Sequence, residues 1–80
     1  MNTYSLVKER LLDLLEKRHM SIYALSMRSG VSPSTVKNIL YGKSKNPGIV
    51  TIKMLCDGLG MSLYDFFDTE EFRSAELELI

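Results

Sequence analysis

Hydrophobic residues recur along the chain at three- and four-residue spacing, and no segment alternates convincingly between apolar and polar positions. The first stripe predicts an amphipathic helix over about residues 5–18, with Thr3 or Ser5 as its N-cap. The stripe consists of Leu6, Val7, Leu11, Leu14 and Leu15. The pattern as a whole predicts an all-α fold.

Cap and turn residues mark two short helices in the middle of the chain. Ser21 is a suitable N-cap for a helix over about 21–28, and Gly30 after it tolerates the positive φ of a tight turn. Ser32, an N-cap followed by Pro33, predicts a third helix over about 33–41 that ends at Gly42. The stretch GKSKNPG that follows is a polar, basic loop.

Two further helices and an acidic end complete the pattern. The spacing predicts a fourth helix over 49–59 and a fifth that begins after Ser62. We expect a compact five-helix domain over residues 1–68 and an acidic C-terminal tail over 69–80. Several methionines and aromatic residues are assigned to the core: Met20, Met27, Met54, Met61, Tyr64, Phe66 and Phe67.

The composition describes an ordinary water-soluble domain. The 80 residues are enough for one domain, and no stretch offers the roughly 20 apolar residues that cross a bilayer. The first ten residues lack the layout of a signal peptide, and the single cysteine suits a reducing compartment. We therefore expect a cytoplasmic protein with no membrane contact.

The formal net charge of zero hides a strong asymmetry along the chain. Residues 1–53 carry nine basic side chains against three acidic ones, whereas residues 54–80 carry one against seven. The two parts therefore have net charges of +6 and −6. Such polarity indicates a basic surface that faces an anionic partner, although a merely solvated basic face has the same pattern.

The second and third predicted helices have the features of a helix-turn-helix. Gly30 provides the tight turn, and Ser26 is small enough for a close approach of the two helices. Four apolar residues are placed to face inward: Leu25, Val31, Val36 and Ile39.

Two stretches, LSMRSGVSPSTVKNILYGKSKNPG and TIKMLCDGLGMSLYDFF, resemble the lambda repressor-like (Cro/cI-type, XRE family) DNA-binding domains. The resemblance extends from about Leu6 to Phe67. It implies that the third helix lies in the major groove of double-stranded DNA.

Carried over by position, the resemblance gives two sets of contacts. The side chains that face base edges are Ser34, Thr35, Lys37 and Asn38. The residues at the positions that commonly contact phosphates are Ser32, Lys43, Lys45 and Asn46. An asparagine amide pairs with adenine, and a lysine donates to guanine or to phosphate.

The chain departs from the family pattern at two positions. Ile22 stands where many relatives have a glutamine that contacts a phosphate, and Leu40 stands where many have a glutamate. Leu40 is expected to enlarge the core. The hydroxyl of Tyr23 is a candidate substitute donor to phosphate.

Other reactive side chains are assigned no chemical role. Cys56 lies on an apolar face, and His19 has no metal-ligand partner at a suitable spacing. Asp65 and Asp68 are accompanied by no nucleophile. We expect no enzymatic activity, no cofactor, no bound metal and no small-molecule ligand.

The leading hypothesis is a sequence-specific DNA-binding regulator of transcription, acting as a repressor. Helix-turn-helix proteins usually bind as two-fold dimers, and the fifth helix and the tail offer apolar residues for a homodimer. The tail residues concerned are Phe72, Leu77, Leu79 and Ile80. The alternative is a protein-interaction module of the same fold, resembling an antitoxin or docking on a polymerase.

Overall fold

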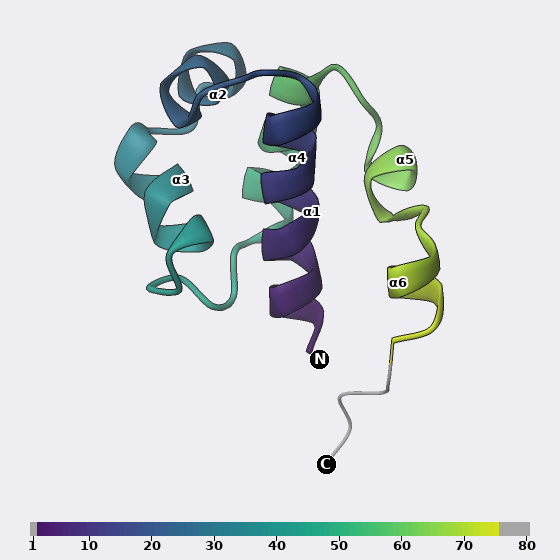
Figure 1. Cartoon of the computed structure of the whole chain (residues 1–80). Coiled ribbons are helices and arrows are strands. Elements are labelled where there is room, and N and C mark those ends of the chain that lie inside the picture. The colour runs from purple at the N-terminus through teal and green to yellow at the C-terminus, as the bar shows by residue number, and fades with distance from the viewer. Residues whose placement is uncertain (1, 76–80) are drawn as a thin grey trace.

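The computed structural model describes residues 2–75, which contain six helices and no strand. The helices are α1 (Thr3–Lys17), α2 (Ile22–Ser29), α3 (Pro33–Leu40), α4 (Ile49–Leu59), α5 (Leu63–Phe67) and α6 (Glu70–Arg73). In Figure 1, α2 and α3 lie on one side of α1, and α5 and α6 lie on the opposite side. The predicted all-α class is confirmed.

The helix boundaries follow the predicted cap residues closely. Ser21, Ser32 and Ser62 accept hydrogen bonds as N-caps of α2, α3 and α5, and α4 covers the predicted residues. The N-cap of α1 was predicted wrongly, because the side chain of Asn2 accepts from the amide of Ser5. The helix therefore begins at Thr3, two residues before the expected start.

One core joins α1 to α5. Phe66, Leu11, Leu25, Ile39, Leu40 and Leu55 are among its fully buried side chains. α2 packs mainly against α4, and Leu40 enlarges the core as expected. Met20, Met54 and Met61 pack against this core, but Met27 is 70% exposed and Tyr64 is 75% exposed. Their assignment to the core was wrong, because each lies on the outer face of a short helix.

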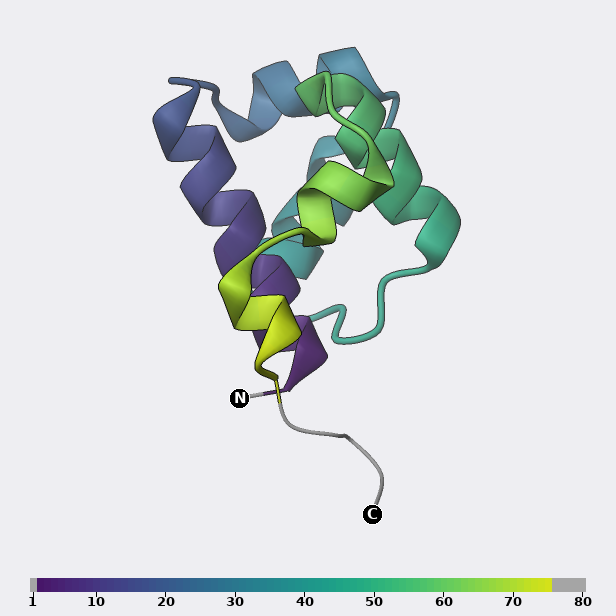
Figure 2. The same ribbon diagram turned by 90° about the vertical axis from the view of Figure 1, so that its right-hand side faces the viewer.

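A sixth helix, α6, follows Phe67 and was not predicted. Thr69 caps it, and Phe72 packs its ring against Phe67 with the ring centres 4.9 Å apart. Figure 2 shows α6 crossing the N-terminal half of α1, against which it packs. Phe72 is therefore engaged with the core instead of being free in a tail. Leu77, Leu79 and Ile80 lie outside the described residues.

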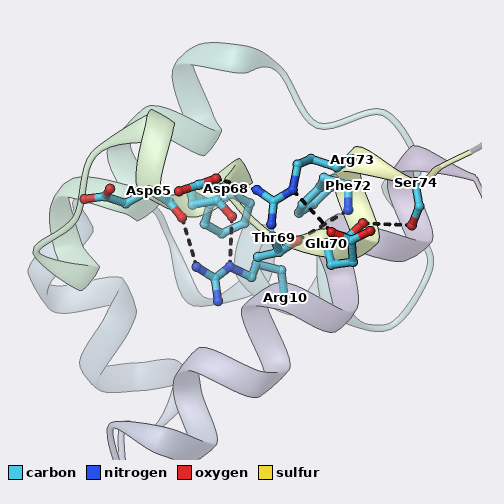
Figure 3. Close-up of polar contacts among 9 residues, drawn as sticks. Arg10, Asp65, Asp68, Thr69, Glu70, Phe72, Arg73 and Ser74 are labelled. Atoms are coloured by element: carbon cyan, nitrogen blue, oxygen red, sulfur yellow. Dashed lines mark hydrogen bonds and ion pairs between the residues drawn. The ribbon is translucent and has the colours of Figure 1, made fainter.

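Arg10 of α1 and Arg18, the C-cap residue of this helix, tie α1 to the ends of other helices. Arg10 donates to the carbonyl oxygens of Phe66 at 2.8 Å and Asp65 at 3.0 Å, as Figure 3 shows. Its guanidinium also lies 5.8 Å from the centre of the Phe66 ring. Arg18 donates to the carbonyl of Leu59 at the end of α4. These cations satisfy helix C-termini inside the domain.

Candidate nucleic-acid interface

The turn between α2 and α3 is built from two serines and a glycine. Gly30 ends α2 with φ of 76°, a left-handed conformation that favours glycine. The buried hydroxyl of Ser26 donates to the carbonyl of Val31 at 2.6 Å, and the hydroxyl of Ser29 accepts from the amide of Val31 at 3.1 Å. The predicted role of Gly30 is confirmed, Ser26 is buried, and these bonds hold the turn between the two helices.

Buried apolar residues set the rotation of α3 about its axis. Val36, Ile39 and Leu40 are each at most 1% exposed. Because a helix has 3.6 residues per turn, the opposite face then points to solvent. Ser34, Lys37 and Asn38 lie on this exposed face, while Thr35 is half-buried. The structure thus places Ser34, Lys37 and Asn38 on one exposed side of α3, with Thr35 half-buried beside them.

Three hydroxyls gather at the start of α3. Ser32 accepts from the amide of Thr35 at 3.2 Å and donates to the Thr35 hydroxyl at 2.9 Å. The hydroxyl of Ser34 lies 3.3 Å from that of Ser32. The side chain of Ser32 is therefore occupied as an N-cap. Because Pro33 has no N–H and the amide of Val31 donates to Ser29, the amides of Ser32 and Ser34 are the ones that remain at this helix start for an anion.

The loop after α3 carries the other predicted contacts. Lys43, Lys45 and Asn46 are all exposed between Gly42 and α4. The amide of Ser44 donates to the carbonyl of Asn38 at 2.9 Å, which folds the loop back against the end of α3. The base-facing turn of α3 and the basic loop are consequently adjacent.

The distribution of ion pairs leaves this face positive. The lysines and arginine that pair with carboxylates lie elsewhere: Lys17 with Asp13, Lys53 with Asp57, and Arg73 with Asp68 and Glu70. Lys37, Lys43 and Lys45 form no ion pair with any of residues 2–75. Neither do Lys8 and Arg28. Three uncompensated cations on α3 and its loop make a surface suited to phosphate.

Tyr41 is a component of this face that the sequence interpretation missed. It follows Lys37 and Asn38 by four and three residues, so it continues their face by one helical turn. Its side chain is 67% exposed. Its spacing from Lys37 and Asn38 could have placed it on this face. An aromatic residue before a helix-ending glycine is equally typical of a core position, so the sequence does not decide between the two.

The departures at the start of α2 have different structural outcomes. Ile22 is half-buried and packs against the core, so this position offers no side-chain donor to a phosphate. Tyr23, the next residue, is 66% exposed. It points away from the core, as its proposed role as a substitute donor requires.

The thiol of Cys56 belongs to the core and not to this surface. Burial raises the pKa of the Cys56 thiol above its ordinary value, so the group stays protonated as part of the core. Residues 2–75 contain no cluster of His, Cys, Asp and Glu suited to a metal ion. Within the same residues, no helix is long and apolar enough to cross a membrane.

Comparisons with known proteins agree with this geometry. A family model described as the Cro/C1-type HTH DNA-binding domain matches residues 10–71. The fold also matches the crystal structure of the prophage Lp1 protein 11, with a TM-score of 0.78 and 32% sequence identity. That match covers 92% of this chain and 97% of the other. No curated protein shows a significant match.

Proposed function

The chain belongs to the Cro/C1-type helix-turn-helix DNA-binding domains, and from this premise we propose that it is a sequence-specific repressor of transcription. The observation that carries the proposal is the continuous exposed face formed by α3 and the 42–48 loop. This face bears three lysines that pair with no carboxylate of residues 2–75. Repression needs only that the bound domain occupy a promoter, so no further surface is required.

In this proposal α3 lies in the major groove and reads base edges. The amide of Asn38 pairs with adenine, and Lys37 donates to guanine acceptors. Ser34 and Thr35 are short and make weaker contacts with bases. These roles are supported by the exposure of Lys37 and Asn38 and by the buried opposite face, which fixes their direction.

Phosphates are held on both sides of the groove contact. Lys43, Lys45 and Asn46 contact the DNA backbone from the loop, and the amides of Ser32 and Ser34 contact it from the start of α3. Tyr23 extends this set from α2. Such contacts position the domain without reading sequence, and the proposed place of action is the cytoplasm.

A homodimer is the proposed binding form. Ile49, Leu63, Tyr64 and Phe67 line an apolar hollow together with Asp68 and Arg73. We call this the α5 surface. Since α3 and α5 lie on opposite sides of the domain (Figure 1), two copies joined by the α5 surface place their α3 helices at the outer ends. Two half-sites about 34 Å apart suit that arrangement. Phe72, expected in this interface, is partly buried and packs against the core.

The decisive experiment offers the purified protein a pool of randomised duplex DNA at moderate salt and sequences what is retained. An enriched motif supports sequence-specific binding, and two mirrored half-sites support the dimer. A folded protein that enriches nothing would overturn the proposal. That result would favour the alternative, a protein-interaction module, for which the exposed Tyr23 and Met27 on α2 offer an apolar contact.

A further inference from the structure

The last turn of α3 is closed by a side chain from the first turn of α1. The carbonyl of Asn38 accepts from the amide of Ser44, its near neighbour in the loop. The carbonyl of Ile39 accepts instead from the hydroxyl of Tyr4, at 2.5 Å and 35 residues away in sequence. The two bonds satisfy carbonyls that a helix end leaves without an internal partner.

Tyr4 is itself rigidly held. It lies in the first turn of α1, is half-buried, and packs against the core. Leu6 and Val7, which follow on the same helix, are buried. Through its hydrogen bond to Ile39, the hydroxyl of Tyr4 therefore ties the end of α3 to the first turn of α1.

The hydroxyl also lies where the basic loop begins. A Cβ on Gly42 would stand 4.0 Å from the Tyr4 oxygen, and Gly42 turns the chain with φ of 86°. Beyond this point a hollow separates the loop from α1, lined by Val7 on one side and Lys45, Asn46 and Pro47 on the other. The loop is therefore not packed tightly against α1, and its orientation depends on how its first residues are held.

We propose that Tyr4 is a positioning residue for DNA binding, which holds the end of α3 and the start of the 42–48 loop so that Lys43 and Lys45 reach phosphates. The inference rests on the proposed function. Tyr4 touches no base in this arrangement. Its hydroxyl sets the relation between base contacts on α3 and phosphate contacts in the loop.

The test is Tyr4→Phe, which keeps the ring in the core and removes only the hydroxyl. We expect the affinity for a duplex with one selected half-site to fall about 3- to 10-fold, in keeping with the loss of one hydrogen bond. The slope of log affinity against log salt should become shallower by about 0.9, the value for one lost phosphate contact. The enriched motif should stay the same. A single half-site keeps the measurement independent of dimer formation.

Thr69→Val is the matched control, because it also removes one hydroxyl that bonds to backbone. Thr69 is the N-cap of α6, and this helix lies on the side of the domain away from α3. It should leave affinity and salt slope unchanged. Hydrogen exchange gives a second reading without DNA: the amide of Ser44 should exchange faster in Tyr4→Phe than in the parent.

Two results would overturn the inference. One is a Tyr4→Phe protein with the parent's affinity and salt slope. The other is an affinity loss of equal size in Thr69→Val, which would reflect general stability alone. If the parent itself binds no duplex selectively, the proposed function fails, whereas unchanged binding by the variant removes only the role of Tyr4.

Discussion

Gly58 of α4 lies so close to Ser29 of α2 that a Cβ added to Gly58 would stand 2.8 Å from the Cβ of Ser29. It would also stand 2.9 Å from the Ser29 backbone nitrogen. Ser29 is the last residue of α2 before the turn at Gly30. The contact therefore places the whole helix-turn-helix on α4, and only glycine fits there.

Gly58→Ala should destabilise the domain by about 1–3 kcal/mol. Alanine favours a helix over glycine by roughly 1 kcal/mol, but here the added methyl meets backbone that has to move. Denaturant unfolding followed by circular dichroism measures the difference. Gly48→Ala is the control, because nothing lies within 4 Å of a Cβ at Gly48. If Gly58→Ala were as stable as the control, the close approach of α4 to the turn would be wrong.

Arg10→Lys should also lower stability, by about 1–2 kcal/mol. Lysine keeps the charge but lacks the fork with which Arg10 reaches the carbonyls of both Asp65 and Phe66. Unfolding in urea gives the change in free energy. Arg28→Lys is the matched control, since Arg28 is exposed and forms no ion pair with residues 2–75, and it should stay within about 0.5 kcal/mol of the parent. Equal effects of the two substitutions would contradict the role of Arg10.

Local signals in the sequence predict most of the fold. Ser21, Ser32 and Ser62 bond to amides three residues ahead, so their positions alone locate three helix starts. The single turn of α6 was not predicted, because its four residues are too few to form a hydrophobic stripe. Its existence depends on Phe72 packing against Phe67, a contact that sequence spacing does not reveal.

In the candidate site too, local sequence predicts some features, whereas others depend on long-range packing. Exposure of Lys37 and Asn38 follows from the apolar spacing of Val36, Ile39 and Leu40, which any reading of the pattern places inward. The hydrogen bond from Tyr4 to Ile39 joins residues 35 positions apart, and the local sequence pattern does not predict it. Long-range bonds of this kind depend on how helices pack, and the same holds for Arg10.

Ile49→Glu should convert a dimer to a monomer. Ile49 is 63% exposed and lines the α5 surface, and a buried carboxylate without a partner costs several kcal/mol at an interface. Analytical ultracentrifugation reports the mass of the protein in solution. Leu12→Glu, on an exposed position of α1, is the control and should leave the mass unchanged. A parent protein that sediments as a monomer at every concentration, alone and on DNA, would remove the proposed dimer.

Asn38→Ala should relax the preference at one base position of each half-site. Loss of a bidentate contact with adenine costs about 1–3 kcal/mol on the best sequence and little on sequences that lack this base. Selection from randomised duplexes, repeated with the variant, measures the change in preference. Asn46→Ala, in the loop, is the comparison: it should weaken all sequences about equally and leave the motif intact. An unchanged motif for Asn38→Ala would mean that this face of α3 does not read DNA.

Lys45→Ala and Lys53→Ala remove the same charge from two different settings. Lys45 is exposed in the loop and pairs with no carboxylate of residues 2–75, whereas Lys53 pairs with Asp57 on α4. Because each neutralised phosphate contributes about −0.9 to the salt slope, Lys45→Ala should make the slope shallower by roughly that amount. Lys53→Ala should leave it nearly unchanged.

Fluorescence anisotropy of a labelled duplex at several salt concentrations gives both slopes. Net charge alone would shift both variants equally, since their formal charges are identical. A difference between them therefore reports where the phosphates lie, on the loop beside α3 or along α4. If both variants changed the salt slope equally, the lysines would act only through long-range attraction. The phosphate contacts assigned to the loop would then be wrong.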